Sequence, residues 1–251
     1  MCFDLDSLPP ITTIVGAAVS HDDVVLEAAD GNEFAAFVAE PDAGSAVGVV
    51  ILPDVRGLYR FYEELALRFA ERGVAAIAID YFGRTAGVAK RDESFPYTEH
   101  VPQTTPEGIQ ADVAAAVAAL RERGAERVFT VGFCMGGRHS WLAAAGEHGL
   151  AGAVGFYGMP SERNGEPGPT ERAAEFTAPI LALQAGADAH ITAEDNAAFE
   201  QALERAGVEH EIVVYDGAPH SFFDRKQDEF ADASADAWRR TLALVGVDAE
   251  R

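Results

Sequence analysis

Lysine, and positive charge in general, is scarce in this chain. The only lysines are Lys90 and Lys226, and 19 Lys and Arg residues stand against 41 Asp and Glu residues, for a formal net charge of −22. Nucleic-acid affinity comes mainly from neutralising phosphates with basic side chains. The charge therefore argues against a nucleic-acid partner, and equally against binding to an anionic membrane surface.

Cysteine and long apolar runs are also scarce. Cys2 and Cys134 are too few for a disulfide framework, and no apolar run approaches the roughly 18 residues of a membrane-spanning helix. The first residues, MCFDLD, lack the basic and apolar regions of a secretory signal peptide. We therefore expect a cytoplasmic protein in which Cys134 is a free thiol.

Signatures of cofactor sites are missing as well. The seven histidines and two cysteines show no metal-ligand spacing. The chain has neither a G-x-G-x-x-G segment nor the lysine of a phosphate-binding loop. The expectation is a protein without cofactor or metal, whose partner is a small molecule.

The chain does have strand-like runs that alternate with helical patterns. An apolar share of 48% in 251 residues is enough for one sizeable core, so we expect a single domain over 1–251. The runs typical of strands are 24–29, 34–39, 47–52, 74–79, 128–131, 151–156, 180–184 and 211–215. The first two flank Asp30-Gly31-Asn32, which predicts a hairpin.

Helices are predicted between these runs. Phe61, Leu65 and Phe69 share one helical face, and Thr105-Pro106 has the form of a helix start. The predicted helices are 59–72, 105–123, 136–146, 192–206 and 230–245, while 81–105 and 158–177 are expected to be loops. The alternation predicts a mostly parallel central sheet with helices on both faces. Ligand sites in such sheets lie at the carboxyl ends of the strands.

Cys134 lies in one of these strand-to-helix segments. The sequence GFCMGG at 132–137 has the form of the nucleophile elbow G-x-S-x-G, with cysteine replacing serine. The glycines would allow a sharp turn that exposes the central side chain, and the N-terminus of the next helix favours a thiolate and a developing oxyanion. The alternative is a buried structural cysteine in a glycine-rich turn.

A thiol nucleophile needs a base, and the base needs a group that orients it. His220 lies in the segment after the last strand, and Asp188 follows the strand 180–184. Considered separately, each residue has an alternative explanation. His220 would be an exposed histidine in a loop, and Asp188 would be an aspartate in a turn or at a helix cap. The order Cys134, Asp188, His220 matches the nucleophile, acid and histidine order of α/β-hydrolases. We therefore expect a triad.

Several segments carry a resemblance to the dienelactone hydrolase (carboxymethylenebutenolidase) family, α/β-hydrolases with a Cys-His-Asp triad. They are LPDVRG at 52–57, DYFGR at 80–84, GFCMGG at 132–137, GFYG at 155–158, GAD at 186–188 and HSFF at 220–223. The cysteine at the elbow is the specific feature, because most α/β-hydrolases use serine there. The resemblance implies an α/β-hydrolase fold.

The resemblance also implies further site residues. Asp54 matches a glutamate that contacts the resting thiol, with a side chain one methylene shorter. The backbone N–H groups of Val55 and Met135 match the oxyanion-hole positions. Arg84 matches an arginine that binds the substrate carboxylate, and Arg225 is the candidate for a second one, although it stands one residue later than expected. The alternative for both arginines is solvated surface charge.

Three functions remain open on the sequence. The first is hydrolysis of an activated ester or lactone, of dienelactone type and anionic, through a thioester intermediate. The second is a broader carboxylesterase or lactonase with another ester, which the Asp54 substitution and the displaced arginine favour. The third is a non-catalytic protein that uses Cys134 for sensing or binding. Since the family is often monomeric, the expected state is a monomer or a small homo-oligomer.

Overall fold

A computed structural model describes residues 6–92, 94–223 and 228–247. Within these residues the strands form one eight-stranded sheet in the order β1-β2-β4-β3-β5-β6-β7-β8. The strands are β1 Val19–Glu27, β2 Glu33–Pro41, β3 Val47–Leu52, β4 Ala75–Ile79, β5 Arg127–Phe133, β6 Gly152–Phe156, β7 Ile180–Ala185 and β8 His210–Tyr215. β1 pairs antiparallel with β2 and β2 antiparallel with β4, and the remaining pairs are parallel.

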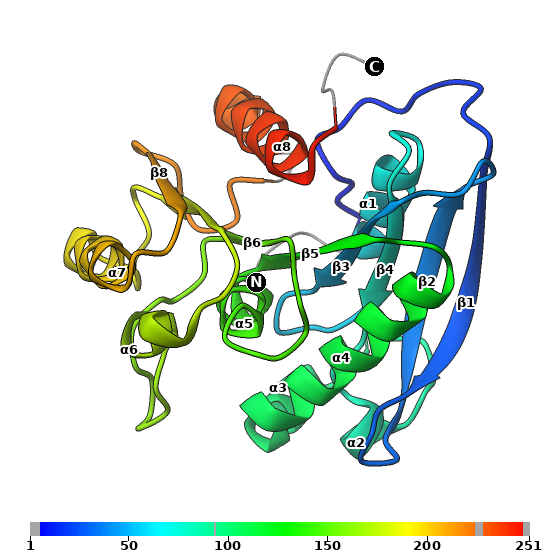
Figure 1. Ribbon diagram of the computed structural model, residues 1–251, viewed down its shortest axis with the longest axis horizontal. Coiled ribbons are helices and arrows are strands. Elements are labelled where there is room, and N and C mark those ends of the chain that lie inside the picture. The colour runs from blue at the N-terminus through cyan, green and yellow to red at the C-terminus, as the bar shows by residue number, and fades with distance from the viewer. Residues whose placement is uncertain (1–5, 93, 224–227, 248–251) are drawn as a thin grey trace.

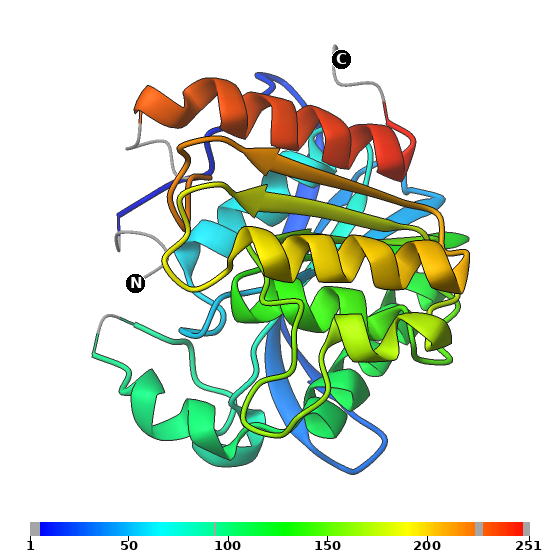
Figure 2. The same cartoon turned by 90° about the vertical axis from the view of Figure 1, so that its left-hand side faces the viewer.

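Helices cover both faces of this sheet (Figures 1 and 2). They are α1 Arg60–Ala70, α2 Gly83–Ala86, α3 Tyr97–His100, α4 Pro106–Glu122, α5 Met135–Ala143, α6 Pro169–Arg172, α7 Ala193–Ala206 and α8 Ala231–Val245. Short 3-10 turns lie at Val101–Gln103, Ala173–Glu175 and Asp228–Phe230. None of the helices in the described ranges is long and apolar enough to cross a membrane.

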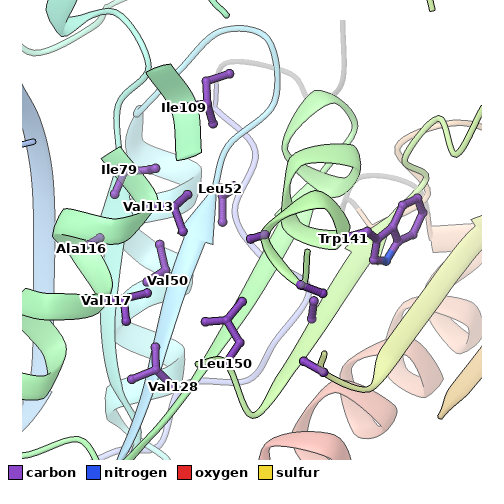
Figure 3. Packing of buried hydrophobic residues seen from close by; sticks show 14 of the residues in the cluster. Val50, Leu52, Ile79, Ile109, Val113, Ala116, Val117, Val128, Trp141 and Leu150 are labelled. Atoms are coloured by element: carbon purple, nitrogen blue, oxygen red, sulfur yellow. The ribbon is translucent and has the colours of Figure 1, made fainter. Parts of the chain in front are cut away.

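The core is divided between the two faces because side chains alternate along each strand. Val49 and Ile51 of β3 pack with α1 and α8, whereas Val50 and Leu52 pack on the opposite face with α4, α5 and α7. Figure 3 shows part of this second cluster, with Val50 and Leu52 close to side chains of α4. Since both faces are covered, the strands β3 and β4 carry almost continuous apolar sequence.

The parallel pairing determines where a site can form. β4, β3, β5, β6, β7 and β8 all run in one direction, so their carboxyl ends meet at one edge of the sheet. The hairpin between β1 and β2 lies at the same edge, because the start of β2 pairs with the end of β4. Segments that are far apart in the sequence are thereby brought together at this edge.

The predicted fold class is confirmed: this is a mostly parallel sheet with helices on both faces. The hairpin at Asp30-Gly31-Asn32 and the five long helices are present at or near their expected bounds. Thr105 caps α4 as expected, since its hydroxyl oxygen accepts a hydrogen bond from the Gly108 N–H. The two expected loops, 81–105 and 158–177, instead contain the short helices α2, α3 and α6. Helices of four residues are too short to produce a readable hydrophobic period.

Candidate active site

Cys134 lies between the end of β5 and the first residue of α5. Its backbone has φ 55° and ψ −113°, a conformation that costs free energy in a residue other than glycine. Two hydrogen bonds hold this turn: the Cys134 N–H donates to the Phe156 carbonyl at 3.0 Å, and the Cys134 carbonyl accepts from the Arg138 N–H at 3.2 Å. The side chain is a free thiol of intermediate exposure. The turn has the strained strand-to-helix geometry of a nucleophile elbow.

The glycines beside Cys134 are required by close backbone approaches. A Cβ at Gly132 would lie 1.9 Å from the Gly136 carbonyl oxygen, and one at Gly136 would lie 2.1 Å from the Leu52 carbonyl oxygen. The second contact shows that the start of α5 packs directly on the end of β3. The loop that carries Val55 therefore lies beside the turn that carries Met135, as the two expected oxyanion-hole donors require.

Asp188 and His220 form a direct pair across two loops. The His220 Nδ1 lies 2.6 Å from Asp188 Oδ2. The Asp188 side chain is fully buried, while that of His220 is 31% exposed. The other carboxylate oxygen of Asp188 accepts the backbone N–H groups of His190 at 2.9 Å and Ile191 at 3.3 Å. Because Nδ1 of His220 is bonded to Asp188, the other ring nitrogen, Nε2, lies on the side of the ring away from Asp188.

The environment of Asp188 favours its ionised form. Burial raises the pKa of this carboxyl, but the hydrogen bond from His220 and those from the backbone N–H groups outweigh it, and the pKa is lowered overall. An ionised Asp188 keeps the proton of the His220 ring on Nδ1.

An aromatic side chain connects the histidine loop to the nucleophile strand. Tyr157 directly follows β6 with φ 38°, and its ring lies 4.9 Å from the ring of His220. The same ring lies 6.3 Å from that of Phe133, the residue before Cys134. Tyr157 belongs to the GFYG segment of the family resemblance, but the sequence analysis assigns it no role in the site. The signal for such a role is its position immediately after a parallel strand.

The Asp54 carboxylate is engaged by its neighbour Arg56. One oxygen accepts the Arg56 N–H at 2.8 Å and the Arg56 Nε at 3.2 Å, and the other accepts Arg56 Nη2 at 2.9 Å. The Arg56 guanidinium also stacks on the Tyr59 ring, 4.3 Å from its centroid. Arg56 was not among the residues expected here, although it lies in the LPDVRG segment directly after β3.

Two tyrosine hydroxyls fix the backbone of the same loop. The Asp54 N–H donates to Tyr62 Oη at 2.9 Å, and Tyr81 Oη donates to the Pro53 carbonyl at 2.7 Å. The pKa of Tyr81 is raised well above its ordinary value, mainly because the side chain is buried and secondly because of the nearby charge of Asp54. Its hydroxyl therefore stays protonated and can donate. The two tyrosines thus hold the backbone of the residues directly before Val55.

Arg84 is paired with two carboxylates. Its Nε and Nη2 donate to Asp30 at 3.1 and 2.8 Å, and its Nη1 donates to Asp112 at 2.7 Å. The side chain therefore ties α2 to the β1–β2 hairpin and to α4. Its expected role toward a substrate carboxylate stays a prediction. Arg225 lies outside the described residues.

A third arginine of this edge, Arg91, was not expected from the sequence. Its Nη2 donates to Asp80 at 2.8 Å, and both side chains are almost fully buried. Since Arg91 stands eleven residues after Asp80, only the folded loop brings it to the strand end. Among the described residues, no group of three or more His, Cys, Asp or Glu side chains could hold a metal ion.

The comparison with known families decides the affiliation of the chain. The profile of the dienelactone hydrolase family matches residues 34–247. The chain belongs to this family. The family expected from the sequence is thereby confirmed, and with it the enzyme class, a dienelactone hydrolase-like hydrolase of esters or lactones.

Relatives of this dienelactone hydrolase family member agree with the match. A protein from Salmonella typhi named "Putative carboxymethylenebutenolidase" is 30% identical over 221 residues, covering 84% of this chain and 82% of its own. A Bradyrhizobium protein named "Probable 2-oxo-3-(5-oxofuran-2-ylidene)propanoate lactonase" is 28% identical, covering 86% of this chain and 90% of its own. The crystal structure of a "Putative Dienelactone Hydrolase" from Klebsiella pneumoniae superposes with a TM-score of 0.79 at 28% identity, covering 91% and 99% of the two chains.

Proposed function

We propose that this family member hydrolyses an activated ester or lactone through a thioester on Cys134, with His220 as the base and Asp188 as the residue that orients it. The observation that carries the proposal is the 2.6 Å His220–Asp188 hydrogen bond, at the same sheet edge as the strained turn of Cys134. A buried structural cysteine would not need that turn, and a loop histidine would not need a buried carboxylate partner.

The reaction divides into acylation and deacylation. In acylation the Cys134 sulfur attacks the substrate carbonyl, and the thiol proton passes to Nε2 of His220. The tetrahedral intermediate then collapses: the bond to the alcohol oxygen breaks, and the His220 proton goes to that oxygen. In deacylation His220 takes a proton from water, and the resulting hydroxide attacks the thioester carbonyl. The carbon–sulfur bond then breaks, His220 returns the proton to the sulfur, and the acid product leaves.

The backbone N–H groups of Val55 and Met135 serve as the oxyanion donors in this proposal. The support is the contact between the end of β3 and the start of α5, together with the two tyrosines that fix the Val55 loop. Donors that are already positioned stabilise the oxyanion without reorganisation during the reaction, which is the usual source of large rate effects.

The sulfur nucleophile also restricts the substrate. A thiolate leaves a tetrahedral intermediate easily, so the intermediate reverts unless the alcohol is a good leaving group. Activated substrates such as enol lactones, which release a stabilised enolate, meet this condition.

The test is ester and lactone turnover by the wild type and by Cys134→Ala. We would follow ring opening of cis- and trans-dienelactone in the ultraviolet, beside release of nitrophenol from p-nitrophenyl acetate. The expected result is activity on at least one substrate, reduced by about 10³-fold or more in Cys134→Ala. Cys2→Ser is the matched control, because it removes the other thiol of the chain and should keep full activity.

The same experiment separates the alternatives. Turnover of the nitrophenyl ester without lactone opening would keep the triad and favour the broader esterase, which the pairing of Arg84 with Asp30 and Asp112 also favours. A reactive Cys134 thiol in the Cys2→Ser protein, without turnover of any substrate, would favour a sensing or binding role. Activity that survives in Cys134→Ala would overturn the proposed mechanism.

A further inference from the structure

The cationic side chains of the two loops that follow β3 and β4 are all paired with carboxylates. The described parts of these loops are 53–59, 80–92 and 94–105, and their Lys and Arg residues are Arg56, Arg84, Lys90 and Arg91. Each has a carboxylate oxygen within 2.9 Å: Asp54 for Arg56, Asp30 and Asp112 for Arg84, Asp23 and Glu63 for Lys90, and Asp80 for Arg91. Arg84 and Lys90 each pair with two carboxylates, so four cations are matched by six carboxylates. These ion pairs together therefore carry a net negative charge.

Arg84 is engaged with carboxylates through all three of its guanidinium nitrogens. Its Nε and Nη2 donate to Asp30, and its Nη1 donates to Asp112. The Asp112 carboxylate is fully buried and accepts a further hydrogen bond from Asn32 Nδ2 at 3.0 Å, so it cannot swing away from the arginine. Burial raises the pKa of Asp112, and the charge and hydrogen bond of Arg84 act against this effect.

Arg56 is engaged in a different way, by burial. Only 7% of its side chain is exposed, and its pKa is raised by Asp54 against the effect of burial. Since the Asp54 carboxylate is fully buried beside it, removing this partner would leave an uncompensated buried charge. The Arg56–Asp54 pair therefore carries no net charge in the loop that contains Val55.

A substrate carboxylate would have to compete with these internal carboxylates. A partner on the same chain acts at a high effective concentration, whereas a substrate arrives at its concentration in solution. The substrate would also have to lose hydration and approach a region with surplus negative charge. An uncharged ester would not have to displace these carboxylates, and it would neither lose the hydration of a charge nor be repelled by the surplus negative charge.

We infer that this enzyme selects substrates with an uncharged acyl part, because its own carboxylates neutralise the arginines of the loops after β3 and β4, with Arg84 the arginine that matters most. The inference rests on the proposed function, since it names the substrate class of that same site. This uncharged substrate class differs from the anionic lactone that the family resemblance implies.

The test uses two esters that share a leaving group and differ in the terminal group of the acyl part, which is charged in one and neutral in the other. p-Nitrophenyl hemisuccinate carries a terminal carboxylate, and p-nitrophenyl methyl succinate carries the methyl ester in its place, with the same leaving group. We expect kcat/KM for the methyl ester to be at least about tenfold higher in dilute buffer. Equal or faster turnover of the hemisuccinate by the wild type would overturn the inference.

Asp30→Asn tests the part played by Arg84. Asp30 is half exposed in the hairpin turn, and asparagine keeps the side-chain oxygen that accepts the Asn32 N–H, so the turn should be preserved. The substitution removes the carboxylate that accepts hydrogen bonds from Nε and Nη2 of Arg84, and it leaves only Nη1 paired with a carboxylate, that of Asp112. We expect kcat/KM for the hemisuccinate to rise at least about threefold while that for the methyl ester is unchanged.

Asp22→Asn is the matched control. Asp22 is exposed on β1 in the same hairpin, so its replacement changes the net charge equally without releasing Arg84. An equal rise in both variants, or no rise in Asp30→Asn, would overturn the assignment to Arg84. If neither ester is turned over, or if Cys134→Ala retains the activity, the proposed function fails instead, so the two failures are distinguishable.

Discussion

At the residue scale, the pairing of Asp188 with His220 has a consequence for stability as well as for catalysis. Asp188 accepts three hydrogen bonds in the folded protein, from the His220 ring and from two backbone N–H groups. These bonds favour the ionised carboxyl, and its pKa in the folded protein is lowered. The unfolded chain has no such partners, so its carboxyl titrates near pH 4.

The stability difference between the wild type and Asp188→Asn should therefore depend on pH. A carboxyl with a lowered pKa in the folded state stabilises the fold above its unfolded pKa, and this contribution is lost as the pH falls through the folded pKa. We expect Asp188→Asn to reduce the free energy of unfolding by about 1.5–3 kcal/mol at neutral pH. The difference should shrink steadily below about pH 4.

Urea unfolding of both proteins across the acidic range measures this difference. Asp22→Asn is a suitable control, since it removes an exposed carboxylate and should change the free energy of unfolding little at any pH. A difference between the wild type and Asp188→Asn that stays constant through the acidic range would contradict the expectation.

At the scale of elements, the junction of β3, β5 and α5 is the most sterically demanding part of the site. A Cβ at Gly136 would meet two backbone carbonyls, those of Leu52 at 2.1 Å and Pro53 at 2.3 Å. Backbone atoms of a central strand cannot move away as the end of a flexible side chain can. The whole junction must shift to accept any side chain there.

We expect Gly136→Ala to lower the free energy of unfolding by more than about 3 kcal/mol, or to prevent folding. Gly124→Ala is the control: Gly124 has φ +100°, yet nothing lies within 4 Å of its added Cβ. That substitution should cost only about 1–2 kcal/mol, from backbone strain alone. Equilibrium unfolding of the two variants gives the comparison, and equal costs would contradict the steric explanation.

The predictability of the elements also differed along the chain. The long helices α1, α4, α7 and α8 have clear starts or apolar faces, and their predicted bounds agree closely with the structure. The sequence predicts a loop over 81–105, yet this segment contains α2 and α3 and supplies Arg84 and Arg91 to the ion pairs. Such short helices are stabilised by tertiary contacts rather than by their own sequence pattern.

At the scale of the whole molecule, the surplus of acidic residues should make stability depend on salt. A net charge of −22 creates repulsion in the compact state, and salt screens charges that lie more than about 8–10 Å apart. Salt also weakens the exposed ion pairs, but these contribute little individually. The repulsion between the many unpaired carboxylates should be the larger effect.

We therefore expect the Tm to rise by about 2–5 °C when sodium chloride is raised from about 10 to 500 mM at neutral pH. Differential scanning calorimetry measures the shift. Sucrose at matched osmolality is the control, which separates charge screening from a general effect of cosolute exclusion. A Tm that falls as salt is added would show that the ion pairs matter more than the repulsion.

Local sequence patterns were sufficient to predict the fold class and to identify the triad candidates. Strand periodicity, helix starts and the glycines around Cys134 act over a few residues, so they can be read locally. The order Cys134, Asp188, His220 combined three local signals, and the structure brings Asp188 and His220 together at 2.6 Å.

Which distant charges neutralise one another depends, by contrast, on how separate segments of the chain pack together. Arg84 meets Asp30 and Asp112, residues 54 and 28 positions away in the chain, and Arg91 reaches Asp80 across a folded loop. Whether an arginine can receive a substrate carboxylate depends on such partners. Partners of this kind are set by how the parallel strands, the hairpin and α4 pack at one sheet edge, and no local pattern in the sequence encodes that packing.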